Sequence, residues 1–246
     1  MKTRILIAAC TLFTPVLANA ACEKFLESWT QKLHPNRTLD SEYATCKPWP
    51  ANPALTLAVL PLPVKGSDPE TGTYDLEVLV ADSDSGSIVA HSYQPSAITY
   101  DAMRLSGISL DTARYQLMPE NRAFGVRISH SGSSRVNPYN TTSLSLYVID
   151  GQRLRPVLGR LMVEKSSGEW DGRCSGEFNS TSRAIDVGAA GADGYAALKI
   201  LEKSKKSTNV FKNGNCTSKD SPGRGTSVVL QHRDGRYVVP KSMQSD

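Results

Sequence analysis

Hydrophobic and polar residues alternate along most of the chain with the two-residue period of a β-strand. Two such runs, separated by a short polar stretch, occur in each of residues 73–94, 115–131 and 143–164. The separating residues include Pro119–Asn121 and the pair Asp150-Gly151, which are residue types that favour tight turns. Each of the three segments therefore predicts a β-hairpin.

Two further β-rich segments, residues 194–203 and 226–240, follow near the C-terminus. The second contains Asp234-Gly235, another pair typical of two-residue hairpin loops. Successive hairpins indicate a mainly β, antiparallel architecture, either a β-sandwich or a small propeller-like array of hairpins. Because the hairpins are irregularly spaced and no sequence repeat aligns them, the sandwich is favoured.

Residues 21–50 follow a different period. Their hydrophobic side chains recur at spacings of three and four and lie on one stripe of a helix; they are Cys22, Phe25, Leu26, Trp29 and Leu33. Pro35 ends this helix, and Asp40 or Ser41 is a suitable N-cap for a short second helix that ends near Cys46. The pattern predicts a helical hairpin that packs on an antiparallel β domain formed by residues 51–246.

Prolines and polar runs mark the remaining segments of this β domain. Pro61 and Pro63 cannot donate backbone hydrogen bonds, so the extended stretch at residues 55–64 is expected at an edge of the sheet. Residues 166–194 and 211–225 are rich in glycine, serine and other polar residues. We expect both segments to cross the surface as loops.

Residues 1–20 have the pattern of a secretory signal peptide. Two basic residues precede an apolar run, residues 5–17, and residues 18–20 supply the small side chains of a cleavage site before Ala21. The apolar run is too short to span a bilayer, and no later run approaches that length. A lipoprotein signal is the alternative, because Cys22 follows closely, but acylation of Cys22 would leave an odd number of cysteines for pairing.

Cleavage after Ala20 leaves four cysteines, an even number that suits an oxidising compartment. Four cysteines allow three pairings, and the shortest-range pairing joins Cys22 to Cys46 and Cys174 to Cys216. We favour this pairing because each bridge brackets one compositional region of the chain. Each disulfide bond would contribute about 2–4 kcal/mol of stability.

The charge of the chain is nearly balanced, with 28 basic and 24 acidic side chains. This balance is not that of a nucleic-acid-binding protein. Residues 199–246 differ, because they hold 10 basic and 4 acidic side chains. The excess suits contact with an anionic partner of the cell envelope or an acidic protein, although a solvated strand face also accounts for it.

One loop combines the residue types that recognise partners. Residues 127–143 contain a histidine, two arginines, two asparagines and several hydroxyl side chains between two predicted strands. Such a loop is either a solvated connection or a recognition surface carried by a rigid β frame. The candidate binding residues in it are His130, Ser131, Arg135 and Tyr139.

The residue sets that would carry catalysis are incomplete. Ser131 and Ser133 lie beside His130, but the chain has no G-x-S-x-G elbow, and the carboxylate pair Glu169 and Asp171 lies in a glycine-rich segment. The four histidines do not have the spacing of metal ligands, and no phosphate-binding glycine loop is present. We therefore predict neither a metal ion nor a cofactor.

These features together predict an exported protein, periplasmic or secreted. Its predicted role is to bind a protein or an envelope component without catalysing a reaction on it, for example as an inhibitor or an immunity-type factor. The first alternative is an exported hydrolase that uses His130 or the pair Glu169 and Asp171. The second alternative is a structural component of an envelope assembly, which would pair with its neighbours through the expected edge strand at residues 55–64.

Overall fold

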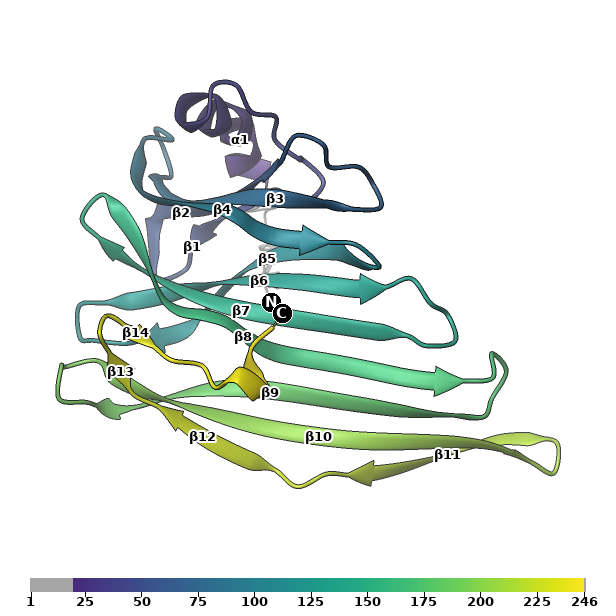
Figure 1. Cartoon of the computed structure of the whole chain (residues 1–246). Helices are drawn as coiled ribbons and strands as arrows, with labels where there is room; N and C mark the ends of the chain where they lie inside the picture. Colours follow the sequence, from purple (N-terminus) through teal and green to yellow (C-terminus); the bar gives the residue numbers. More distant parts are fainter. Residues whose placement is uncertain (1–19, 246) are drawn as a thin grey trace, which may run out of the picture.

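The computed structural model describes residues 20–245, and within them the chain is mainly β, as predicted (Figure 1). The predicted leader lies, apart from Ala20, outside the described residues. The helices and strands are α1 (Ala20–Leu33), β1 (Thr45–Trp49), β2 (Asn52–Pro63), β3 (Gly72–Asp82), β4 (Ile88–Tyr100), β5 (Met103–Gln116), β6 (Arg122–Gly132), β7 (Tyr139–Asp150), β8 (Arg153–Trp170), β9 (Gly176–Ala190), β10 (Ala196–Lys212), β11 (Asn215–Pro222), β12 (Thr226–Leu230), β13 (His232–Arg233), β14 (Arg236–Tyr237) and the 3-10 helix η1 (Lys241–Met243). Neither α1 nor η1 has the length and hydrophobicity needed to cross a membrane.

The strands form one large, curled sheet whose main path runs β1-β2-β3-β4-β8-β7-β6-β5 (Figure 1). The sheet is not closed, because β5 contacts β1 and β2 without a backbone ladder between them. Two side chains link these edges instead: Tyr43 Oη donates to the carbonyl oxygen of Leu105 at 3.0 Å, and Lys47 Nζ donates to that of Leu110 at 2.6 Å. The strands therefore form packed layers and not the separate blades of a propeller.

The first core lies inside this curl. The ring centroids of Trp49 and Phe124 are 5.9 Å apart there, and those of Phe124 and Tyr147 are 5.8 Å apart. Trp49 comes from β1 at one end of the sheet path, whereas Phe124 and Tyr147 come from the neighbouring strands β6 and β7 near the other end. The curl brings the two ends of the sheet face to face and removes these side chains from water.

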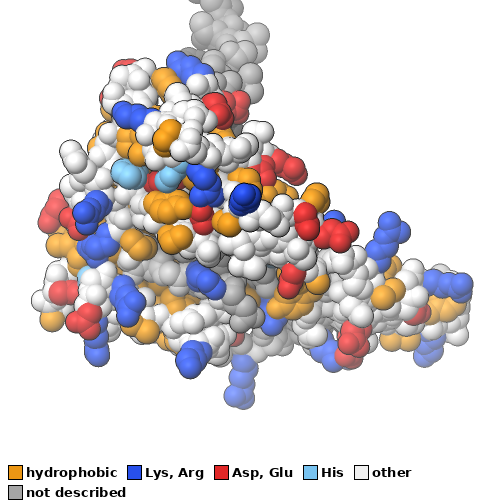
Figure 2. Space-filling model, turned by 45° about the horizontal axis from the view of Figure 1, so that its top comes forward, with side chains coloured by type: hydrophobic (Ala, Val, Ile, Leu, Met, Phe, Trp, Pro, Cys, Tyr) orange, Lys and Arg blue, Asp and Glu red, His pale blue; other side chains and the backbone are white. Residues whose placement is uncertain are grey.

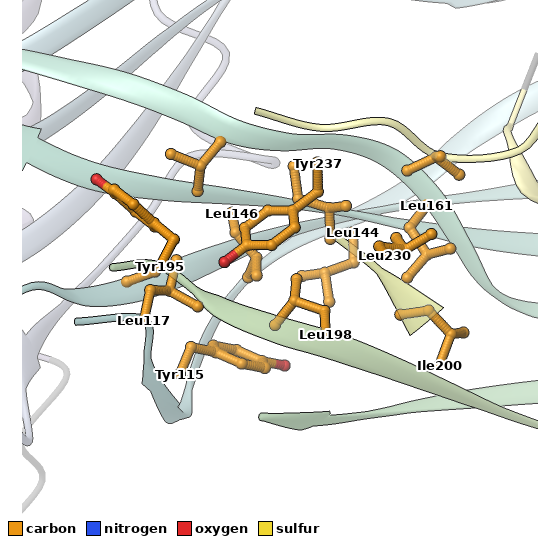
Figure 3. Close-up of a cluster of buried hydrophobic side chains, with 14 of the residues drawn as sticks. Tyr115, Leu117, Leu144, Leu146, Leu161, Tyr195, Leu198, Ile200, Leu230 and Tyr237 are labelled. Carbon is orange, nitrogen blue, oxygen red and sulfur yellow. The ribbon is translucent and has the colours of Figure 1, made fainter. Parts of the chain in front are cut away.

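The second core lies on the opposite side of the strands β7 and β8. Leu146 of β7 packs there with Leu198 of β10 and with Tyr237 of β14 (Figure 3). The strands β9, β10 and β12 and the C-terminal segment thus cover a face that would otherwise expose a row of leucine side chains to water. The hairpin predicted from Asp234-Gly235 is present here as β13 and β14.

Helix α1 packs on the outer face of β2 and β3 through the predicted hydrophobic stripe. Trp29 is buried, and its Nε1 donates to the carbonyl oxygen of Gly86 at 2.6 Å. Gly86 has a φ of 70°, and a Cβ atom at this position would lie 2.7 Å from the ring of Phe25. The β3–β4 turn therefore requires glycine where the helix meets it.

The predicted pairing of Cys22 with Cys46 is confirmed, but the predicted second helix is wrong. The disulfide joins α1 to β1, a strand that pairs with β2. Asp40 begins a turn and not a helix, because its Oδ1 accepts from the backbone N–H of Glu42 and its Oδ2 accepts from Tyr74 Oη at 2.6 Å. Tyr74 on β3 is distant in sequence, and its hydrogen bond to Asp40 outweighs the local capping signal.

The buried carboxylate of Glu77 joins α1 to the sheet. Glu77 is 0 % exposed, and its two oxygens contact His34 Nε2 at 2.7 Å and His91 Nδ1 at 3.1 Å. Nearby, Arg37 forms an ion pair with Asp75 at 2.6 Å. Because His34 and Arg37 follow α1 directly while the two carboxylates lie on β3, these contacts fix the C-terminal end of the helix on the sheet.

Strand β2 corrects the expectation of an edge strand at residues 55–64. Residues 56–59 pair with β1 on one side and with β3 on the other, so they lie inside the sheet. The ladder with β1 ends at Val59, and Pro61 and Pro63 pair only with β3. Proline is tolerated there because no neighbouring strand needs its missing donor.

Strands β8 to β11 continue beyond both cores as a long ladder, and we call residues 164–182 and 203–222 the arm (Figure 1). The expectation of loops at residues 166–194 and 211–225 is therefore wrong over most of their length. Polar residues form strands here because their backbone groups are paired while their side chains stay in water. The predicted disulfide between Cys174 and Cys216 joins the β8–β9 turn to β11.

Candidate functional site

The structure divides the four candidate binding residues between two places. His130 on β6 and Tyr139 on β7 line one pocket of about 360 Å³, which we call the His130 pocket. Ser131 follows His130 on the strand, so its side chain points to the opposite face. Arg135 lies in the β6–β7 loop and lines a different pocket, together with Trp170. The residues predicted as one recognition loop thus contribute to two separate surfaces.

The His130 pocket is built by five strands, β4 to β8, and by the C-terminal segment. Residues 96–99 of β4 form one wall, and β6, β7 and β8 contribute the opposite side. The apolar side chains of Ile128 and Met162 line it beside the hydroxyl groups of Thr141 and Tyr139. The pocket can therefore hold a small group that is partly apolar and partly hydrogen-bonding.

His130 has an unsatisfied hydrogen-bonding group at this pocket. Its ring is half-buried, and its Nε2 is buried without a hydrogen-bond partner among the described residues. Burial lowers the pKa of His130 below its ordinary value, and the charge of Arg160 lowers it further, while a hydrogen bond with the backbone of Thr99 and the charge of Asp101 act in the opposite direction. The imidazole is therefore neutral at pH 7 and is able to donate or accept one further hydrogen bond.

Two cationic side chains from β8 line the same pocket. Arg160 adopts a φ of 47°, an uncommon conformation for a residue other than glycine, and its backbone N–H donates to Ser145 Oγ at 3.1 Å. The register of β8 on β7 shifts here, since Leu144 pairs with Leu161 but Leu146 pairs with Leu158. The shift is a bulge, which turns the side chain of Arg160 towards the pocket.

The second cation, Lys165, follows another register shift in the same strand pair. Its Nζ lies 5.4 Å from the ring centroid of Tyr139, within reach of a cation–π contact. Asp101 is the acidic side chain that lines the pocket beside these two cations. The pocket is therefore electropositive and favours a ligand group with negative charge.

The alternative catalytic sets do not assemble among the described residues. No serine hydroxyl lies within hydrogen-bond distance of His130 Nε2, so the histidine does not form a base–nucleophile pair. Asp171 accepts from the backbone N–H groups of Arg173 and Cys174, both at 2.8 Å, and these bonds lower its pKa. Neither Asp171 nor Glu169 lines the pocket next to Trp170.

Sequence reasoning missed Arg160, Lys165 and the wall at residues 96–99. A signal for Arg160 was present, because Gly159 interrupts an otherwise regular hydrophobic strand, and an isolated glycine in a strand indicates a bulge. Lys165 and the β4 wall had no such signal. They reach the pocket only because β4 diverges from β8 after the single pair His91–Arg153.

We expect His130 to make the protein less stable in mild acid. Because its pKa is lowered in the folded state, the unfolded chain takes up a proton first as the pH falls below about 6.5, and folding stability decreases. His130→Gln should therefore reduce the loss of unfolding free energy between pH 7.5 and pH 5.5, measured by urea denaturation. A variant with the same pH dependence as the unmodified protein would contradict this expectation.

Comparison of the chain with protein-family models, with curated proteins and with solved structures gave no match.

Proposed function

We propose that the protein is an exported, non-enzymatic binding protein, periplasmic or secreted, that recognises a protein or an envelope component. The observation that carries the proposal is the His130 pocket, in which Arg160 and Lys165 lie beside a neutral histidine and several hydroxyl groups. An acidic group of the partner would form charge-assisted hydrogen bonds with the two cations. A ligand atom that reaches His130 Nε2 would also remove the cost of leaving it unpaired.

Export is supported by cysteine chemistry together with the leader pattern. Both disulfide bonds are formed within the described residues, and such bonds persist in oxidising compartments. Peptide mapping under non-reducing conditions, on protein isolated from the producing cells, should recover the linked pairs Cys22–Cys46 and Cys174–Cys216. Free thiols at all four cysteines would contradict export.

The binding role is tested by capture from an envelope extract on the immobilised protein. The unmodified protein should retain a saturable partner, and the double variant Arg160→Gln with Lys165→Gln should bind it at least about tenfold more weakly, because each lost charge-assisted hydrogen bond costs about 1.5–3 kcal/mol. The control, Lys199→Gln with Arg233→Gln, removes two exposed positive charges on other strands and should bind normally.

Two outcomes would contradict this role. The first is the absence of any saturable partner under several ionic conditions. The second is an equal loss of binding in the two double variants, because that result would trace binding to net charge and not to the His130 pocket.

A further inference from the structure

One face of the arm carries an ordered set of polar side chains. Residues that are paired directly in an antiparallel ladder point to the same face of the sheet, so the strand registers define rows across it. The four rows, running from β7 or β8 towards β10 or β11, are Thr142–Glu164–Ser182–Lys203, Asn140–Ser166–Ser180–Lys205, Gly168–Phe178–Ser207–Asp220 and Trp170–Gly176–Asn209–Ser218. Only Phe178 and Trp170 among them are large and hydrophobic.

Three hollows on this face adjoin one another. The first and second, of about 260 and 210 Å³, share Ser166 and Ser180, and the second and third share Pro138 and Phe178. Together they form one groove, which we call the arm groove, from the first row to the fourth. Because each row is two residues from the next, the groove is roughly 20 Å long.

The two aromatic side chains form a platform at one end of the arm groove. The ring of Phe178 lies against Gly168, where a Cβ atom would be 2.4 Å from it, and its centroid is 6.4 Å from that of Trp170. Trp170 Nε1 donates to the carbonyl oxygen of Arg135, which fixes the orientation of the indole. Aromatic rings held in this way offer a flat apolar surface beside hydrogen-bonding groups.

The charges that line the arm groove are mostly positive. Arg135 and Arg173 lie at the aromatic end, Lys205 lies in the middle, and Lys203 belongs to the row at the other end. The acidic side chains of the rows are Glu164 and Asp220, and Asp220 pairs with Lys205 at 3.2 Å. Figure 2 shows the arm as a narrow projection with lysine and arginine side chains along it. The groove therefore complements an elongated anionic ligand.

We propose that the arm groove binds an extended glycan chain that carries carboxylate groups. The apolar face of a sugar ring fits on Phe178 and Trp170, the sugar hydroxyls match the serine, threonine and asparagine side chains of the rows, and the carboxylates match the lysine and arginine side chains. This site is distinct from the His130 pocket, although Thr141 and Lys165 border both.

Other anionic ligands fit the groove less well. An acidic peptide would add to a sheet edge, where backbone groups are free, whereas on this face the backbone groups of β8, β9 and β10 are occupied by the ladder. An anionic lipid surface is flat and would not fill a groove whose floor consists of hydroxyl and amide side chains. The ordered polar rows favour a ligand with many hydroxyl groups.

The proposal is tested by calorimetric titration of the full, disulfide-bonded protein with hexagalacturonate, and with maltohexaose as the uncharged probe. Hexagalacturonate should bind, with an affinity that falls as salt is added, and maltohexaose should bind much more weakly. Lys205→Gln should weaken binding of hexagalacturonate by at least about tenfold, because one charge-assisted hydrogen bond is lost. Phe178→Ala should also weaken it.

Lys206→Gln is the matched control. Lys206 is the next residue of β10, so its side chain points to the opposite face, where it pairs with Glu177 at 2.8 Å. This variant removes the same charge from the same strand and should bind hexagalacturonate normally. The proposal would be overturned by no binding of hexagalacturonate, by equal losses in the Lys205 and Lys206 variants, or by tighter binding of polyglutamate or of vesicles with anionic lipid.

Discussion

Replacing His34 and His91 together by leucine should lower the free energy of unfolding by about 3–5 kcal/mol at pH 7. Both histidines contact the carboxylate of Glu77, which is 0 % exposed. The double variant leaves this carboxylate buried without either partner. Removing both partners of a buried carboxylate is costly for this reason, since the remaining group can regain neither water nor a hydrogen-bond donor.

Urea denaturation of three variants measures the effect. His91→Leu alone should cost less than the double variant, because the side chain of His91 is 43 % exposed and His34 still contacts Glu77 in its absence. Adding Glu77→Gln to the double variant should recover part of the loss, because it removes the isolated charge. If the double variant is as stable as the unmodified protein, or if Glu77→Gln lowers its stability further, the histidines do not support a buried charge.

Replacing Cys22 and Cys46 together by alanine should lower the free energy of unfolding by about 3 kcal/mol. The two residues are 24 positions apart, and cross-linking a chain segment of that length removes much conformational freedom from the unfolded state. The native state is affected too, because the bond ties α1 to β1. We therefore expect faster amide hydrogen exchange in α1, while exchange in β7 and β8 stays slow.

A reductant supplies the control for this second experiment. Dithiothreitol should destabilise the unmodified protein strongly, and it should affect the double variant only through the remaining bond between Cys174 and Cys216. An unfolding free energy of the double variant within about 0.5 kcal/mol of the unmodified protein would contradict the prediction.

The hairpins were predictable because their signals are local. The turn at Asp150-Gly151 separates two strands of alternating hydrophobicity, and Gly151 has the positive φ that this turn requires. Asp234 and Gly235 both have positive φ, as a two-residue hairpin loop of this type demands. In these segments the turn residues and the two alternating hydrophobic and polar runs beside them are sufficient to specify the hairpin.

The arm was not predictable in the same way. Its strands lack a hydrophobic face, because over most of their length they pack on no core, and their composition is that of loops. The turn at Asn213-Gly214 does carry a local hairpin signal, with both residues at positive φ. The polar residues on each side show no alternation of hydrophobic and polar positions, so only the pairing of β10 with β9 reveals the strand.

The candidate site depends even more than the arm does on contacts between segments that are far apart in the sequence. His130 and Tyr139 were found from the composition of one loop, but the walls of their pocket come from β4 and β8. The curl of the sheet brings these strands together, and a bulge orients Arg160. Neither the curl nor the orientation is encoded within a short window of sequence, so the cationic character of the site became apparent only in three dimensions.

Among the described strands β11 pairs only with β10, so its outer edge presents free backbone donors and acceptors to solvent. Such an edge is a template on which a strand from another copy could grow into a fibril. The composition of β11 opposes that outcome: its one hydrophobic residue, Cys216, is held in a disulfide bond, Lys219 and Asp220 carry charge, and Pro222 lacks a donor. A second strand would bury almost no apolar surface there. The protein can therefore project a long ladder into solvent and still resist amyloid-like polymerisation.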